Sequence, residues 1–354
     1  MARSVKFEPL RSEAEDAQSD VASYKIASYP ADFTLEVLHK KEADGFVYVP
    51  EFQRHFVWNL KQASKLIESF LLGLPVPQLF MYKDEPTGKL VVIDGQQRLK
   101  SIFGFFDGTI TIRGSEREFR LVGVHDRWKA KLFVDLETRD QQKFRDSVLR
   151  AVIVEQLDPK DRTSVFHIYE RLNTGGTVLT PQEVRNCVYR GTFNALLKEL
   201  NETTQWRLLF GSQRSDYRMR DIELILRFFA LHDCLRDYEK PMKEFLSVYM
   251  DNRRNPDKRT INAKRRLFIQ TVQNVCAALG KKPFHRKSGL NAAVFDSVMV
   301  AFARNSNASR RGVAAKYARL LTHEPYLLRV TESTTDESAV HKRIDLANHM
   351  LFGA

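Results

Sequence analysis

A change of pattern about halfway along the chain is the feature that most constrains its fold. Before about Glu155, short runs rich in β-branched and aromatic residues alternate with helical segments, and after it helical spacing dominates to the C-terminus. Strands mixed with helices, followed by helices alone, predict an α+β first domain and an all-helical second domain. The strand-like runs are 46–49, 78–82, 90–93, 109–112, 119–124 and 151–155.

This pattern divides the chain into three segments. With 354 residues the chain is longer than most single domains, and 43% hydrophobic residues are enough to build folded cores. Residues 1–22 mix acids, Ser and Ala without a period, so we expect a mobile arm there. The α+β domain is placed at 23–190 and the helical domain at 191–354.

The cysteines and the hydropathy favour a cytoplasmic protein. Cys187, Cys234 and Cys276 lie far apart without C-x-x-C spacing, which predicts neither a disulfide framework nor a zinc ribbon. The first twenty residues lack the apolar core of a signal peptide, and no stretch approaches about 18 uncharged apolar residues. We therefore expect a cytoplasmic location and no membrane partner.

Capping signals mark the clearest helices. Residues 58–74 carry apolar side chains at three- and four-residue steps, with Asn59 and Gln62 as a capping box and Gly73 near the end. Residues 180–183 repeat the capping box, with proline at the first helical position. Further helices are expected at 221–232, 263–279, 292–304 and 313–321.

A strand–turn–helix junction carries the strongest chemical signal. A buried-strand run at 89–93 is followed by a glycine turn and then by apolar residues at helical spacing. Such a junction directs backbone N–H groups and the positive end of the helix dipole at one point, and the Arg98 guanidinium suits phosphate oxygens. The alternative is that Asp94 caps the helix and Arg98 is a solvated first-turn residue. The junction residues are Asp94, Gly95, Gln96, Gln97 and Arg98.

Two other segments offer similar groups. Gln53 and Arg54 lie between the run at 46–49 and Trp58, although Trp58 can be a core aromatic and Arg54 can extend to solvent. A helix downstream ends in glycines that allow close backbone approach to a ligand, although a Gly-Gly end is also an ordinary helix cap. That end carries Arg171, Asn173, Thr174, Gly175 and Gly176.

Together these segments resemble the N-terminal domain family of GmrSD-type restriction endonucleases, in the wider ParB/sulfiredoxin-like superfamily. The resemblance covers about residues 30–190, and segments near 218–224 and 340–344 are similar to the helical part of single-module members. Its marks are Pro50, Phe52, Gln53 and Arg54 with Trp58; Glu68 and Ser69 with Gly73, Pro75 and Pro77; Asp94–Arg98; and Tyr169, Arg171, Asn173, Gly175 and Gly176 with Leu179, Glu183 and Asn186.

The resemblance implies a ParB/sulfiredoxin-like fold and nucleotide binding, often with triphosphate hydrolysis, in defence against modified or foreign DNA. It places Asp94, Gln97 and Arg98 at the phosphates and Arg54 opposite them. Chemically, Asp94 suits a metal-bridging or water-orienting carboxylate, Gln97 a water-positioning group, and the two arginines clamps on developing phosphoryl charge. The expected ligands are Mg²⁺ or Mn²⁺ with a nucleoside triphosphate. The expected phosphate-binding set is Gln53, Arg54, Gly95, Gln96, Gln97, Arg98, Arg171, Asn173, Thr174, Gly175 and Gly176.

One departure from the family concerns nuclease chemistry. Many members also carry an HNH-like module, which needs a His general base and metal ligands on a ββα unit. His323, His341 and His349 lie in a region of helix and loop without that pattern. We therefore expect a single-module member without intrinsic HNH activity.

The formal charge of +12 favours a polyanionic partner, and basic clusters lie in the second half. We assign a cluster set to DNA phosphates, with a solvated helical face as the alternative. It comprises Arg253, Arg254, Lys258, Arg259, Lys264, Arg265 and Arg266, and the basic pairs at 281–282, 286–287 and 310–311 carry the same interpretation.

Three functions stay open at this point. The first is an NTP hydrolase or nucleotide sensor in a restriction or anti-phage system. The second is a non-hydrolysing DNA-binding adaptor, and the third is a DNA nickase or nuclease that uses the same pocket. An effector protein or a second copy of the chain is the further partner we consider.

Overall fold

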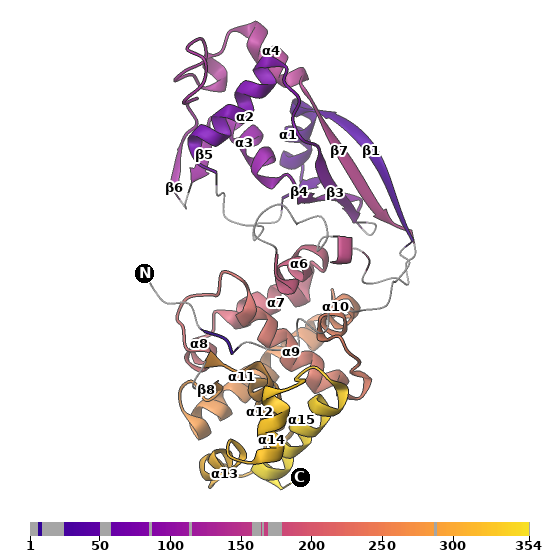
Figure 1. Cartoon of the computed structure of the whole chain (residues 1–354), viewed down its shortest axis with the longest axis vertical. Helices are drawn as coiled ribbons and strands as arrows, with labels where there is room; N and C mark the ends of the chain where they lie inside the picture. Colours follow the sequence, from indigo (N-terminus) through magenta and orange to yellow (C-terminus); the bar gives the residue numbers. More distant parts are fainter. Residues whose placement is uncertain are drawn as a thin grey trace. The chain divides into compact units, whose positions relative to one another are not determined.

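The computed structural model divides into two compact units, Tyr24–Val178 and Leu179–Ala354 together with Met1–Ser23. Figure 1 shows most of the strands in the first unit and most of the helices in the second. The predicted α+β and all-helical architecture is confirmed. The structure describes residues 6–8, 25–49, 58–84, 87–112, 115–157, 164, 166–168, 179–286 and 289–353.

A mixed five-stranded sheet, in the order β1-β7-β3-β4-β2, forms the frame of the first unit. β1 pairs antiparallel with β7, β7 parallel with β3, β3 antiparallel with β4, and β4 parallel with β2. A separate hairpin joins β5 and β6. The strands are β1 Ile26–Thr34, β2 Val47–Tyr48, β3 Leu79–Asp84, β4 Lys89–Asp94, β5 Thr109–Ile112, β6 Ser115–Glu118 and β7 Val148–Gln156.

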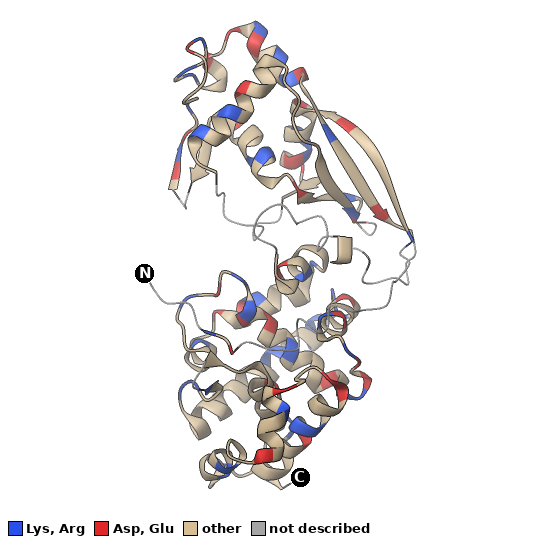
Figure 2. Cartoon of the chain, in the orientation of Figure 1, with Lys and Arg blue, Asp and Glu red and all other residues tan. Residues whose placement is uncertain are grey.

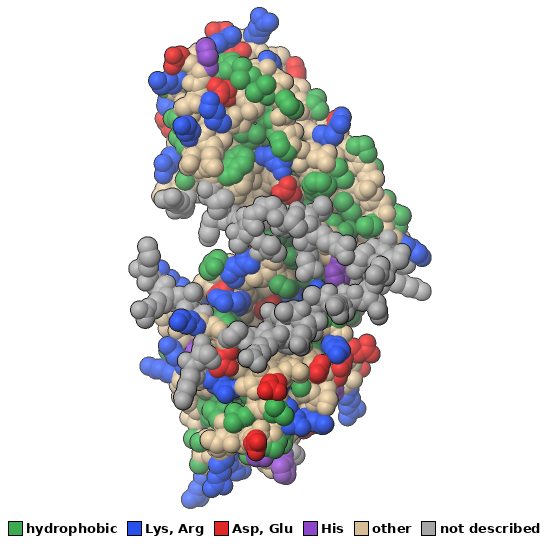
Figure 3. Space-filling view, viewed as in Figure 1, with side chains coloured by type: hydrophobic (Ala, Val, Ile, Leu, Met, Phe, Trp, Pro, Cys, Tyr) green, Lys and Arg blue, Asp and Glu red, His purple; other side chains and the backbone are tan. Residues whose placement is uncertain are grey.

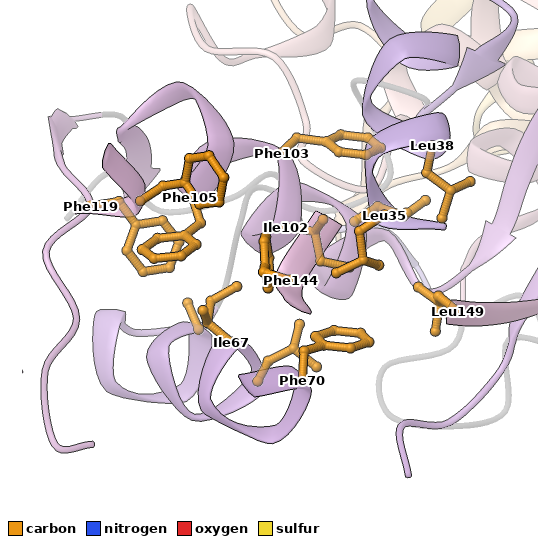
Figure 4. Close-up of a cluster of buried hydrophobic side chains, with 14 of the residues drawn as sticks. Leu35, Leu38, Ile67, Phe70, Ile102, Phe103, Phe105, Phe119, Phe144 and Leu149 are labelled. Atoms are coloured by element: carbon orange, nitrogen blue, oxygen red, sulfur yellow. The ribbon is translucent and has the colours of Figure 1, made fainter. Parts of the chain in front are cut away.

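Helices supply most of the core of this unit. α2 begins at the predicted capping box, where the Asn59 side chain and Gln62 bond reciprocally, and it ends at Gly73 in the left-handed conformation. α2 packs against α3, and Figure 4 shows Ile67 and Phe70 of α2 directed into the cluster that includes Ile102. The helices are α1 Leu35–Ala43, α2 Leu60–Leu72, α3 Gln96–Asp107 and α4 Thr138–Asp146, with a 3₁₀ turn, η1, at Phe133–Asp135.

The second unit is built around α12, Ala292–Arg304, nearly all of whose side chains are buried. A helix that is buried on all sides needs neighbours on all sides, and α9, α11, α14 and α15 pack against it. A short hairpin, β8 His285–Arg286 with β9 Gly289–Leu290, precedes α12. The other helices are α6 Pro181–Val188, α7 Thr192–Asn201, α8 Thr204–Phe210, α9 Arg220–Cys234, η2 Leu235–Asp237, α10 Met242–Asn252, α11 Lys258–Leu279, α13 Val313–Leu320, α14 Glu324–Thr331 and α15 Glu337–Phe352.

A fully buried ion triad lies in this helical core. The Asp296 carboxylate of α12 accepts from Arg227 of α9 at 2.6 Å and from Arg343 of α15 at 2.9 Å. All three side chains are at most 5% exposed. Because a buried charge without a partner is very unfavourable, the triad fixes how these three helices pack.

Three details differ from the sequence-based expectations. The run 119–124 is irregular: Phe119 and Leu121 are buried, but Leu121 pairs only with the backbone at 130–131. β1 was not expected at all. Within the expected mobile arm, Lys6–Glu8 hydrogen bond with Leu290, so this part is held against the helical unit.

Among the helices that the structure describes, none combines the length and the apolar character that crossing a membrane requires.

Candidate functional site

The junction between β4 and α3 forms as the sequence predicts, and its glycine is required by packing. Gly95 follows directly on β4 with a φ of +105°, in the left-handed region. A Cβ atom on Gly95 would lie 2.2 Å from Leu79 Cδ2, which no real side chain tolerates. The close approach of β3 to this turn therefore explains the glycine without any ligand.

Arg98 is committed to contacts within the protein. Its Nη1 donates to the carbonyl oxygens of Pro77 and Gln78, the latter at 2.8 Å, and its Nη2 donates to Asp94 Oδ2 at 2.6 Å. Only 13% of the side chain is exposed. Arg98 thus ties the first turn of α3 to the end of β4 and to the segment that leads into β3.

The two glutamines of the junction also face inward. Gln97 Oε1 accepts from the backbone N–H of Trp58 at 3.3 Å, which connects α3 to the start of α2. Gln96 is buried. A ligand at this junction would therefore meet the backbone of these residues more readily than their side-chain amides.

Asp94 is the exception, because 47% of its side chain is exposed. The carboxylate lies at the carboxyl end of β4, one residue before the N-cap of α3, and Arg98 holds it from the protein side. Gly95 has no side chain to cap that helix. Asp94 thus presents an exposed carboxylate next to the positive end of α3.

No group of three or more His, Cys, Asp or Glu side chains that could hold a metal occurs within the described parts of the chain. The described residues therefore do not form a metal site made of protein ligands alone. One carboxylate together with the phosphates of a nucleotide is, however, a usual way for proteins to bind Mg²⁺.

The other two segments of the expected site lie outside the described residues. Whether they approach Asp94 therefore stays a prediction. The residues concerned are Gln53, Arg54, Arg171, Asn173, Thr174, Gly175 and Gly176.

Several residues that carried the resemblance have structural roles. Glu68 of α2 accepts from the backbone N–H of His125 at 2.7 Å and from Lys65 at 2.6 Å, which holds the loop after β6 against α2. Glu183 closes the capping box of α6 with Thr180. Asn186 is buried and donates to Met219.

The basic residues assigned to DNA fall into two groups. Lys264 donates to Asp233 at 2.6 Å, and Arg265 makes two bonds of 2.7 Å to Glu199. Arg253 lies 3.6 Å from Asp233, and Arg254 donates to the Arg190 carbonyl oxygen. These four are engaged within the protein, whereas the side chains of Lys258, Arg259 and Arg266 are exposed.

Asp233, which sequence reasoning did not single out, contacts two members of the first group, Lys264 and Arg253. Burial raises the pKa of Asp233, but hydrogen bonds from His232 and Lys264 outweigh that effect and hold the pKa well below its usual range. Asp296 was missed as well, although an acid inside the apolar run 292–303 is a signal of a buried charge pair.

Comparison with known protein families gives a match. The family model of the GmrSD restriction endonuclease N-terminal domain covers residues 35–190. No curated protein matches the chain. The matched segment contains β2, β3, β4 and β7 of the sheet, the β4–α3 junction and α6. Residues 35–190, a little less than half of the chain, are therefore similar to the GmrSD restriction endonuclease N-terminal domain family.

Proposed function

We propose that this chain is the nucleotide-binding component of a restriction or anti-phage defence system. The restriction setting comes from the family to which residues 35–190 are similar. The nucleoside triphosphate binds at the β4–α3 junction with a divalent cation, Mg²⁺ or Mn²⁺, and its hydrolysis is the reaction that this site would perform.

The half-exposed Asp94 carboxylate beside an uncapped helix N-terminus carries this proposal. The positive end of α3 attracts phosphate, but the negative Asp94 repels it. A divalent cation between the carboxylate and the phosphates removes that conflict, because it is attracted to both. Asp94 therefore acts as the metal-bridging group in this proposal.

The contacts of Arg98 change its role from the one expected. With its guanidinium on Pro77, Gln78 and Asp94, Arg98 is a positioning residue that orients the carboxylate. Gln97, bonded to Trp58, holds the start of α2 in place. The clamps on phosphoryl charge would then come from Arg54 and Arg171, whose placement is a prediction.

The test compares Asp94→Asn with a matched control, Asp32→Asn. Asp32 is 48% exposed and pairs with Arg150 at 2.9 Å, so it matches Asp94 in exposure and in its arginine partner. Binding of fluorescent ATP and GTP analogues and release of phosphate are measured for the full chain with and without Mg²⁺. Asp94→Asn should weaken Mg²⁺-dependent binding at least about 10-fold, the scale of losing support for a metal ion.

Asp32→Asn should bind and turn over nucleotide like the unmodified protein. Equal binding by the Asp94→Asn variant would remove Asp94 from the site. Binding without phosphate release would reduce the function to a nucleotide sensor, and absence of binding by the unmodified protein would favour the DNA-binding adaptor.

A further inference from the structure

The net charge of the chain comes from one stretch of the helical unit. Residues 258–323 contain fourteen Lys and Arg and a single acid, Asp296, a net of +13, whereas the whole chain carries +12. Average composition would give roughly eight acids in a stretch of this length. Asp296 is fully buried against Arg227 and Arg343, so no acid of this stretch reaches the surface.

Part of this charge lies on the turn after α11, on α13 and at the end of α12, which precedes α13 in the chain. The Tyr317 hydroxyl of α13 donates to the Pro283 carbonyl oxygen at 2.6 Å, which places α13 beside the turn after α11. α13 also packs against α11 itself. Figure 2 shows Lys and Arg along α13 and around β8, and in Figure 3 basic side chains project from the region that Figure 1 labels α13.

We call this region the basic surface. Its six members all belong to the exposed class, and no carboxylate of a described residue lies within 4.0 Å of their charged nitrogens. They are Lys281, Lys282, Arg304, Arg311, Lys316 and Arg319.

The basic surface differs from an ordinary solvated face. Soluble surfaces usually intersperse both signs of charge, because like charges repel and lower stability. Some cations elsewhere in this unit are matched by acids, as Lys264 is by Asp233 and Arg265 by Glu199. His285 is affected by this excess of positive charge, because burial and, second, the charge of Lys282 lower the pKa of its imidazole.

We propose that the basic surface binds the phosphate backbone of duplex DNA. This inference rests on the proposed restriction setting only for its choice of duplex DNA. Arg311 lies next to the N-terminus of α13, where Gly312 is the N-cap residue. The small, exposed side chains of Ala314 and Ala315 let a phosphate approach this helix end closely. Lys316 donates to the Leu351 carbonyl oxygen at 3.1 Å. The other five cations, on helices and turns, contact phosphates without reading bases, so binding is independent of sequence.

The test is a four-residue neutralisation in the full chain, Lys281→Gln, Lys282→Gln, Arg311→Gln and Arg319→Gln. Fluorescence anisotropy with a labelled 24-base-pair duplex of arbitrary sequence is measured from 50 to 200 mM salt, without nucleotide. Each lost phosphate contact should reduce the slope of log K against log salt by about 0.9, so the slope should fall by roughly 3 to 4. Affinity at 100 mM salt should drop about 100-fold or more.

The control neutralises four exposed cations of the other unit, Lys40→Gln, Lys61→Gln, Arg139→Gln and Lys143→Gln. It changes the net charge equally, and it should bind DNA within a few-fold of the unmodified protein. A charge-keeping variant, Lys281→Arg, Lys282→Arg, Arg311→Lys and Arg319→Lys, should also keep binding. Melting temperatures show whether each variant folds.

Four results overturn the proposal: no binding by the unmodified protein at 50 mM salt, an unchanged slope in the neutralised variant, equal losses in the control, or tighter binding to single-stranded RNA than to the duplex. Asp94→Asn should leave DNA binding intact. Failure of the nucleotide proposal and failure of this one are therefore distinguishable.

Discussion

Replacing Arg98 with alanine should destabilise the α+β unit rather than leave its fold untouched. The change removes the bonds to the Pro77 and Gln78 carbonyl oxygens and the ion pair with Asp94. Hydrogen bonds that involve a charged group contribute about 1.5–3 kcal/mol each when covered, and the half-exposed ion pair at most about 1 kcal/mol. Because the freed oxygens can rehydrate in part, we expect a loss of about 2–4 kcal/mol.

The assay is urea unfolding combined with hydrogen–deuterium exchange of peptides from α3 and β3. Arg98→Ala should lower the unfolding midpoint and increase exchange in both peptides, whereas Asp94→Asn should cost less than about 1 kcal/mol. Arg98→Lys should fall between them, because one ammonium group cannot reach all the acceptors that the planar guanidinium serves. If Arg98→Ala unfolds at the same urea concentration as Asp94→Asn, Arg98 is not a positioning residue, and a direct role at a ligand regains support.

Three further predictions concern the helical unit. Asp296→Asn leaves two buried guanidiniums without the Asp296 carboxylate, so the free energy of unfolding measured in urea should fall by about 3–5 kcal/mol. The control Asp336→Asn removes a half-exposed pair with Lys240 and should change the free energy of unfolding by at most about 1 kcal/mol. Lys282→Gln should raise the pKa of His285 in an NMR titration. Because the pKa of His285 in the folded protein lies below 6.5, protonation of this residue opposes folding. The free energy of unfolding that is lost as the pH falls through this range should therefore be smaller in the variant. An unchanged titration curve would rule out the field of Lys282. Finally, the protein with Mg²⁺ and NTPs should not make double-strand breaks, since His323 lies at the N-cap position of α14 and both His341 and His349 lie on α15 rather than on a ββα unit. Linear phage DNA on a gel that disappears with Asp94→Asn would reverse this.

The elements that could be predicted are those whose signals are local. α2 and α6 begin at capping boxes, and β3, β4 and β7 are apolar runs between turn residues. β1 has no such signal: the segment at 26–34 mixes apolar and polar residues and contains Pro30, and its strand exists because it pairs along its whole length with β7. A strand that is specified by its partner cannot be inferred from its own residues.

The same distinction applies to the site. The position of Asp94, Gly95 and the start of α3 follows from a strand run next to a glycine, and the four-residue spacing of Asp94 and Arg98 is itself compatible with an ion pair. The acceptors at Pro77 and Gln78, however, lie about twenty residues earlier in the chain. Only the antiparallel pairing of β3 with β4 brings these carbonyl oxygens to Arg98. The inward direction of the Arg98 side chain could therefore be seen only in the tertiary structure.

Clusters of basic residues illustrate why charge density along a sequence is a weak guide to a binding surface. The cluster at 264–266 is the densest in the chain, yet Asp233 and Glu199, more than thirty residues away, neutralise Lys264 and Arg265. The members of the basic surface are spread from Lys281 to Arg319, and only Lys281, Lys282 and Arg311 belong to basic pairs that the sequence suggested. What distinguishes them is the absence of acids, which persists after folding because the one acid of that stretch is buried in the ion triad. An uncompensated surface charge, rather than a run of arginines, is therefore the feature that points to a polyanionic partner.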